Sequence, residues 1–145
     1  MVLGGAITLP ATDVPAPFID IDDIADVAVA ALVEDGHHGE IYEVTGPRML
    51  TFGQAAAEIS GAAVREVVFV PLAKESFMAG ATDSGVPADI AWLLNYLFET
   101  VLDGRNAFLP DGVQRALGRA PKDFTVFAEE VARAGKWRIQ QELSA

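Results

Sequence analysis

Four aspartates gather around the start of a predicted helix, where carboxylates at this density could bind a metal ion or transfer protons. They are Asp20, Asp22, Asp23 and Asp26. A helix start also favours acidic residues, because a carboxylate accepts its free backbone N–H groups and is stabilised by the positive end of the helix dipole. The chain has no cysteine, and its two adjacent histidines have no third ligand at a metal-site spacing, so the sequence predicts no metal site. We therefore interpret the aspartates as helix caps and solvated charges, with Asp22 or Asp23 opening the helix.

Aromatic and basic side chains supply the other candidates for a binding site. Trp92 and Tyr96 are four residues apart on a predicted helix, so they share a face, and their polar tips suit the wall of a half-buried pocket. Arg48 is the only base among the first sixty residues. Both features have plainer interpretations, since the aromatic pair could pack in a core or an interface and Arg48 could pair with a neighbouring acid. No catalytic residue is assigned, because no serine lies in a Gly-x-Ser-x-Gly elbow and there is no thiol.

A strand–helix–strand unit over residues 17–47 would position the aspartates and Arg48. Its strands are predicted at residues 18–21 and 41–44, and its helix stops at Gly36. Apolar residues occur all around this helix, so we expect it to be covered on more than one side. Further strands are predicted at residues 7–9 and 65–72, and a helix begins at the cap Thr51 and stops near Gly61.

Beyond residue 72 the pattern becomes almost wholly helical. Helices are predicted at residues 75–81, 87–102 and 113–117, and from Pro121 onward. This change divides the chain into an α/β piece over residues 1–72, a helical cap over residues 73–137 and a tail over residues 138–145, which we expect to be loosely held.

Composition narrows the possible functions. The 145 residues carry a net charge of −11, with ten acids and one base in residues 1–60, and an acidic surface repels nucleic acid. The longest apolar runs have seven residues, whereas a membrane-spanning helix needs about 20. We also find no secretory signal, and the lack of cysteine fits a cytoplasmic protein. The expected partners are therefore neither nucleic acid nor membrane.

Three stretches of the sequence resemble the carboxyl-terminal half of NmrA-like proteins, which are atypical short-chain dehydrogenase/reductases of the NAD(P)-binding Rossmann superfamily. They are PFIDIDDIADVAVAAL, GEIYEVTGPRMLTFGQAAAEIS and REVVFVPL, and ALGRAPKDFTVFAEE resembles the family's terminal helical segment. The resemblance implies an α/β fold that is a partial Rossmann-type back half, with few short strands, flanking helices and a helical cap. It also aligns Asp23 with an aspartate at the strand-to-helix junction, which we interpret as a structural cap.

The resemblance further implies a front half that holds NAD(P)H and a back half that shapes the substrate pocket. Residues 16–18 would pass near the nicotinamide and residues 45–48 would form the rim, which makes Phe18 and Arg48 pocket candidates beside Trp92 and Tyr96. Plain packing is the alternative for Phe18. The sequence departs from the family because it contains neither a Gly-x-x-Gly-x-x-Gly loop nor a Tyr-x-x-x-Lys pair. We therefore expect no cofactor-binding residue on this chain alone and no tight binding of NAD(P)H.

Two functional hypotheses remain open. The chain could be the substrate-binding half of an NAD(P)H-dependent oxidoreductase or redox sensor, inactive alone and acting with a separate Rossmann half on a small-molecule ligand. Alternatively it could be a non-catalytic binding or oligomerisation module, in which an open sheet edge and the apolar helix near residues 22–33 become buried in a homo-oligomer.

Overall fold

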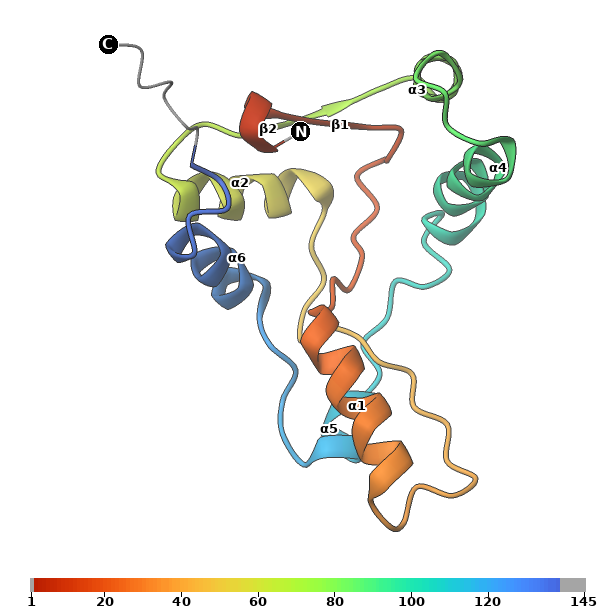
Figure 1. Ribbon diagram of the computed structural model, residues 1–145, viewed down its shortest axis with the longest axis vertical. Coiled ribbons are helices and arrows are strands. Elements are labelled where there is room, and N and C mark those ends of the chain that lie inside the picture. The colour runs from red at the N-terminus through yellow and green to blue at the C-terminus, as the bar shows by residue number, and fades with distance from the viewer. Residues whose placement is uncertain (1, 139–145) are drawn as a thin grey trace.

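A computed structural model describes residues 2–138. The molecule is elongated, with a small sheet at one end and a pair of helices at the other (Figure 1). Of the predicted tail, only Arg138 belongs to the described residues. No helix within residues 2–138 has the length and apolar character that crossing a membrane requires.

The sheet has two parallel strands, β1 (Ala6–Leu9) and β2 (Val68–Pro71), with Ala6 opposite Val68. A short 3-10 turn, η1 (Val2–Gly4), precedes β1. The connection between the strands includes α2 (Phe52–Ala63), which packs on β2 and on the later helix α6 (Phe124–Arg133). The strands predicted at residues 7–9 and 65–72 are thus confirmed in position, although β2 is shorter than expected.

The start of α2 is also confirmed. The Thr51 hydroxyl accepts a hydrogen bond from the Gln54 N–H, and the Gln54 side chain accepts one from the Thr51 N–H, which completes a capping box. The predicted stop at Gly61 is wrong, because α2 continues to Ala63 and ends at Val64 in the left-handed conformation, with φ of 53°.

The two strands predicted on either side of the first long helix are wrong. Residues 18–20 belong to no strand of the described chain, although Asp20 has an extended backbone, and α1 (Ile21–Val33) has already begun at Ile21. Residues 41–45 also form no strand, and within the described chain none of their backbone groups bonds to another main-chain group. Side chains there still alternate, with Ile41 and Glu43 exposed and Tyr42 and Val44 half-buried. This alternation is typical of a strand, but residues 2–138 supply no neighbouring strand to form a ladder.

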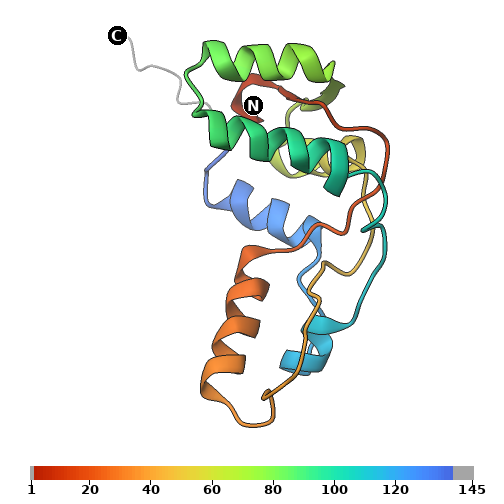
Figure 2. The ribbon, with the colours of Figure 1, turned by 90° about the vertical axis from the view of Figure 1, so that its right-hand side faces the viewer.

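At this end of the molecule α1 packs against α5 (Gly112–Leu117), and Figure 2 shows the two helices with the extended segment passing beside α5. Their core consists of Val27, Val113 and Ala116, with half-buried Tyr42 and Val44 against it. The expectation that α1 is covered on more than one side is wrong for the described chain. Only one stripe of the helix is buried: Asp23, Val27 and Ala30.

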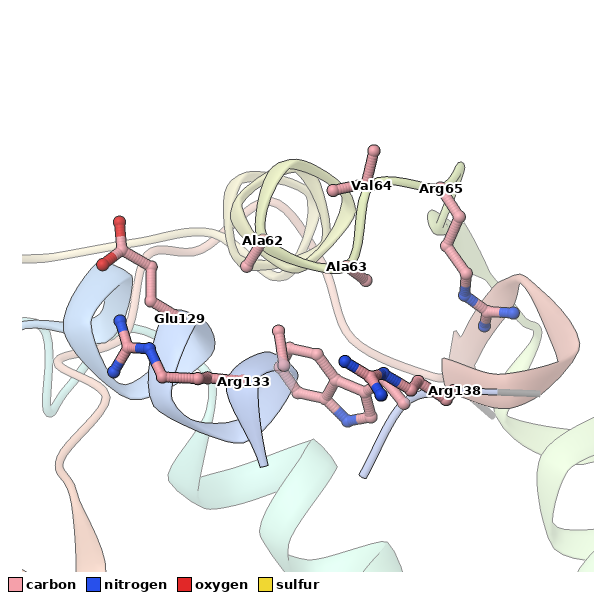
Figure 3. A pocket seen from close by; sticks show the side chains of 9 residues that line it. Ala62, Ala63, Val64, Arg65, Glu129, Arg133 and Arg138 are labelled. Atoms are coloured by element: carbon pink, nitrogen blue, oxygen red, sulfur yellow. The ribbon is translucent and has the colours of Figure 1, made fainter. Parts of the chain in front are cut away.

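The helices that follow residue 72 pack in different places. α3 (Lys74–Asp83) and α4 (Ala88–Tyr96) contact each other and stand to one side of the sheet (Figure 1). The helix predicted over residues 87–102 changes at Leu97 into a π-helical turn, η2 (Leu97–Val101). In contrast, α5 packs on α1 and α6 packs on α2, where the ends of α2 and α6 enclose a hollow (Figure 3).

Candidate functional site

Phe18 lies at the centre of an aromatic cluster that joins the two ends of the molecule. Its ring packs edge-on against Phe52 of α2 and Phe124 of α6, with ring centroids 5.2 and 5.4 Å apart. Phe52 in turn stacks on Phe69 of β2 at 5.8 Å. Each such pair contributes about 1 kcal/mol beyond its burial. The cluster therefore fixes the extended segment before α1 against both the sheet and α6.

One side of this cluster opens into a cavity of about 350 Å³, which we call the Phe18 cavity. Its lining residues are Phe18, Ile19, Asp20, Ile21, Lys122, Phe124 and Phe127. Three aromatic rings and two isoleucines make the walls apolar, while one ammonium and one carboxylate supply the polar contacts. This size and this chemistry suit a small, planar, largely apolar ligand that carries a polar group.

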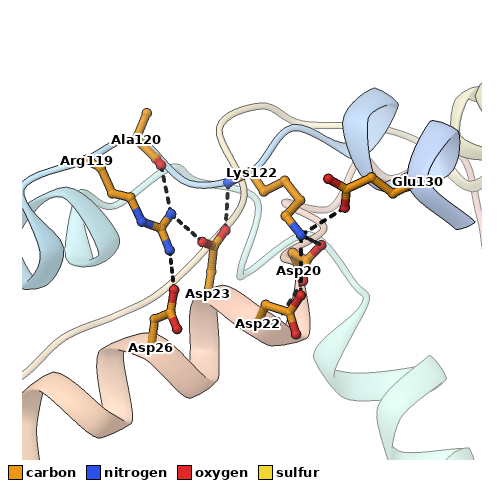
Figure 4. A network of polar contacts seen from close by, with 8 residues as sticks. All are labelled: Asp20, Asp22, Asp23, Asp26, Arg119, Ala120, Lys122 and Glu130. Atoms are coloured by element: carbon orange, nitrogen blue, oxygen red, sulfur yellow. Dashed lines mark hydrogen bonds and ion pairs between the residues drawn. The ribbon is translucent and has the colours of Figure 1, made fainter.

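The polar edge of the Phe18 cavity is an ordered network around Lys122 (Figure 4). The Lys122 ammonium lies 3.1 Å from carboxylate oxygens of both Asp20 and Glu130, and 3.4 Å from Asp22. Hydrogen bonding to Asp20, followed by that to Glu130, raises the pKa of Lys122 well above its usual value. Lys122 is therefore a permanent cation whose charge is balanced by acids, and it is suited to positioning rather than to proton transfer.

The roles of the aspartates differ from the predicted ones. The helix cap is Asp20, whose carboxylate accepts a hydrogen bond from the Asp22 N–H at 2.8 Å. The interpretation of Asp23 as the cap is wrong. Asp23 is only 1% exposed and accepts hydrogen bonds from the Arg119 guanidinium and the Lys122 N–H, both at 2.6 Å. Its role is structural, because it fastens α1 to the segment that leads into α6 (Figure 4).

Arg48 is held by two carboxylates outside the Phe18 cavity. Its guanidinium makes a two-point contact with Asp123 at 2.6 and 2.8 Å, and it also contacts Glu58 at 2.7 Å. Asp123 caps α6, so the cluster joins residue 48 to the start of α6 and to α2. The plainer interpretation of Arg48, pairing with an acid, is confirmed. The Arg48 hydrogen bonds hold the pKa of the Asp123 carboxyl far below its usual range.

This shift predicts a pH dependence for the variant Asp123→Asn, which keeps a capping side chain but loses the charge. A carboxylate with a lowered folded-state pKa stabilises the fold above its unfolded pKa of about 4, and that contribution disappears as the pH falls through the folded-state pKa. Allowing for solvent screening of this half-exposed pair, we expect the variant to be less stable by about 1 kcal/mol at pH 7.

Denaturant melts between pH 7 and pH 2.5 measure this difference. The gap between the two proteins should narrow as the pH falls below about 4. The variant Asp13→Asn, at an exposed loop position, serves as the control and should match the unmodified protein at pH 7. A gap for Asp123→Asn that stayed constant down to the lowest pH would contradict the assigned ion pair.

The other two predicted pocket residues lie on α4. Trp92 and Tyr96 stack with ring centroids 5.6 Å apart and an interplanar angle of 12°, which confirms that they share a face. Both are exposed, at 66% and 44%. Of the four predicted pocket residues, only Phe18 lines the Phe18 cavity. Whether Arg48, Trp92 and Tyr96 contact a ligand stays a prediction.

Sequence reasoning did not identify Asp20, Lys122, Phe124 or Phe127 as residues of this site. The spacing of Phe124 and Phe127 indicates an apolar helix face, but it cannot show that this face meets Phe18, more than a hundred residues earlier. Within residues 2–138 no group of three or more histidine or acidic residues is arranged to hold a metal ion.

Comparison with known proteins gives related sequences and a related fold. No protein-family model matches the chain. The chain is 35% identical over 133 residues to the uncharacterized oxidoreductase YesF of Bacillus subtilis, covering 92% of this chain and 46% of that protein. It is also 35% identical over 130 residues to the NAD(P)H azoreductase of Xenophilus azovorans, covering 90% of this chain and 46% of that enzyme.

A solved structure with a related fold is that of the NADPH-dependent quinone oxidoreductase of Escherichia coli in complex with NADPH. It matches with a TM-score of 0.78 and 22% identity, over 90% of this chain and 46% of the reductase. The α/β fold expected from the sequence is therefore confirmed. The chain spans about half the length of the relatives it matches.

Proposed function

We propose that this chain, which resembles the carboxyl-terminal half of NmrA-like atypical short-chain dehydrogenase/reductases, forms the substrate-binding half of an NAD(P)H-dependent oxidoreductase. The observation that carries the proposal is the match of about nine-tenths of the chain to 46% of two oxidoreductases. The substrate class we propose is a planar aromatic oxidant, such as a quinone or an azo compound, because related proteins act on such compounds and the walls of the Phe18 cavity are aromatic.

Two surfaces support a role as one half of a larger reductase. The strand-like residues 41–45 have no main-chain partner within the described chain, and their backbone groups could pair with an edge strand of a Rossmann sheet. Beside them, α1 exposes large apolar side chains, including Ile21 at 75% and Leu32 at 84%. An apolar helix face of this kind is normally covered in a complete α/β domain.

The cofactor is proposed to come with the partner half. The 145 residues contain no glycine-rich phosphate loop, and that loop with the following helix N-terminus supplies most dinucleotide recognition. On its own, therefore, the chain should not bind NADPH with a micromolar dissociation constant, which corresponds to about −8 kcal/mol.

Titration calorimetry tests this expectation. NADPH is titrated into the chain alone and into a fusion in which the dinucleotide-binding half of the Xenophilus azoreductase precedes it. We expect no binding heat from the chain alone and micromolar affinity from the fusion. Micromolar binding by the chain alone would contradict the proposal, because it would require a phosphate site on these 145 residues.

A second candidate function is a homo-oligomerisation module, and the exposed face of α1 favours it. Two copies could cover each other's Ile21, Leu32 and Val33, which are all at least 74% exposed. The net charge of −11 opposes association, and salt screens that repulsion. We therefore expect the molecular mass measured by light scattering to rise with salt concentration.

The variant Leu32→Asp should abolish this rise, because it places a charge in the proposed contact. Leu109→Asp, a change of the same kind at a half-exposed loop position outside α1, should leave it intact. A monomer at high salt and high protein concentration would contradict oligomerisation without affecting the substrate-binding proposal.

A further inference from the structure

A second hollow lies between the ends of α2 and α6 and is separate from the Phe18 cavity. Its volume is about 670 Å³. Its functional groups are Arg65, Arg133 and Arg138, the indole of Trp137 and the carboxylate of Glu129. We call it the arginine hollow. Figure 3 shows Arg65 and Arg138 beside the same space below Ala63, with Arg133 close to Glu129 on the other side.

The charge of this hollow is opposite to that of the molecule. The chain carries 21 acids and 10 bases, yet three of its seven arginines line this one site with a single acid. The other four arginines, Arg48, Arg105, Arg115 and Arg119, all pair with carboxylates. Within residues 2–138 no ion pair joins any arginine of the hollow to a carboxylate. Among the described residues, the lining of the hollow therefore carries a net positive charge.

Arg65 has hydrogen-bond donors that the described residues leave unsatisfied. One terminal nitrogen donates to the Leu3 carbonyl at 3.1 Å, but Nε and the other terminal nitrogen are buried and have no hydrogen-bond partner among residues 2–138. Buried charged donors in this state destabilise a protein unless something satisfies them. The preceding residue, Val64, has φ of 53°, a conformation that a β-branched residue rarely adopts. Such strain is typical of ligand sites.

We propose that the arginine hollow binds an organic anion that combines an aromatic ring with a phosphate or carboxylate group. Guanidinium groups recognise these anions through two parallel N–H···O bonds, and Arg65 and Arg138 would supply them. The aromatic ring would pack against Trp137, whose indole is fixed edge-on by Phe127 at 6.4 Å. The volume suits a small organic ligand. This site is independent of the proposed reductase function.

Two-dimensional NMR of the indole N–H groups tests the site with phenyl phosphate as the probe. The chain has two tryptophans, so the variant Trp92→Phe assigns the Trp137 resonance. Phenyl phosphate should shift that resonance in a saturable way. Phenol, which has the ring alone, and inorganic phosphate, which has the anion alone, should bind at least about tenfold more weakly, because each lacks one of the two contacts.

Matched variants identify the arginines responsible. Arg138→Gln, at an exposed position, should weaken phenyl phosphate binding by about tenfold, and Arg65→Gln should have a similar effect. Arg105→Gln, which removes an arginine that already pairs with Asp103, should leave the affinity unchanged. No saturable shift of Trp137, equal binding of phenol or inorganic phosphate, or equal loss in Arg105→Gln would each overturn the proposal.

Discussion

Replacing Gly46 with alanine should lower the free energy of unfolding by about 3 kcal/mol or more. Gly46 is buried against the backbone of Phe18, and an added Cβ would lie 2.9 Å from the Phe18 carbonyl carbon and closer still to its oxygen. No side-chain rotation relieves a clash with backbone, so the segment that carries Phe18 would have to move. The aromatic cluster of Phe18, Phe52 and Phe124 should loosen with it.

Urea melts of Gly46→Ala and Gly61→Ala measure this effect against a matched control. Gly61 lies inside α2 with nothing within 4 Å of its added Cβ, so the same substitution there should stabilise the protein by about 0.5–1 kcal/mol. The two variants should thus change stability in opposite directions. If Gly46→Ala melted like the unmodified protein, the close approach of residues 18 and 46 would be wrong.

Replacing Asp23 with alanine should cost about 3 kcal/mol of stability. The buried Asp23 carboxylate accepts from Arg119 and from the Lys122 N–H, so its removal takes away two charge-assisted hydrogen bonds and leaves the Lys122 N–H without a partner. This exceeds the loss of about 1 kcal/mol that a helix cap would give. The size of the stability loss therefore distinguishes the two roles considered for Asp23, a helix cap and a buried ion-pair partner.

Asp26 provides the comparison for Asp23, since it contacts the same arginine from an exposed position. Its side chain is 58% exposed and accepts from Arg119 at 2.6 Å. Asp26→Ala should therefore cost no more than about 0.5 kcal/mol, as for other surface ion pairs. Denaturant melts measure both variants. Equal losses for Asp23→Ala and Asp26→Ala would show that burial does not strengthen the Asp23 contacts.

Features that depend on neighbouring residues could be predicted from the sequence. Thr51 caps the start of α2, as predicted, because a helix cap forms within one helical turn. The stacking of Trp92 on Tyr96 follows from their spacing of four residues. Two helix ends broke these local rules: α2 stops at Val64, a residue type that rarely adopts positive φ, and α1 is capped by Asp20 rather than by Asp22 or Asp23.

Features that depend on distant residues could not be predicted. Residues 18–21 and 41–44 have strand-like sequences, but a strand also needs a neighbour, and the described chain supplies none. Asp23 obeys the rule for helix starts, yet its contacts come from Arg119 and Lys122, about a hundred residues later. The Phe18 cavity likewise depends on Phe124 and Phe127, whose spacing indicates only an apolar helix face.

The segments that lack a pairing strand or a covering surface within the described chain lie on the same part of the molecule. Residues 41–45 and helix α1 are close in the fold, because Tyr42, Val44 and Val27 of α1 share one core with α5. The Phe18 cavity begins where α1 starts, at Asp20 and Ile21. A partner half that covered α1 would therefore also lie near the cavity. This arrangement supports the proposal that the chain binds the substrate while its partner half binds the cofactor.

The most direct test of the substrate-binding proposal is a titration of the chain with the quinone menadione, followed by NMR of ¹³C-labelled phenylalanine rings. We predict saturable shifts of Phe18, Phe124 and Phe127, with a dissociation constant of about 0.1–1 mM because the cofactor wall of the pocket is absent. Phe77 and Phe98, which pack together 5.5 Å apart on α3 and η2, should not move. Shifts at Phe77 and Phe98 equal to those at Phe18, or no shift at Phe18, would contradict the assignment of the Phe18 cavity as the substrate site.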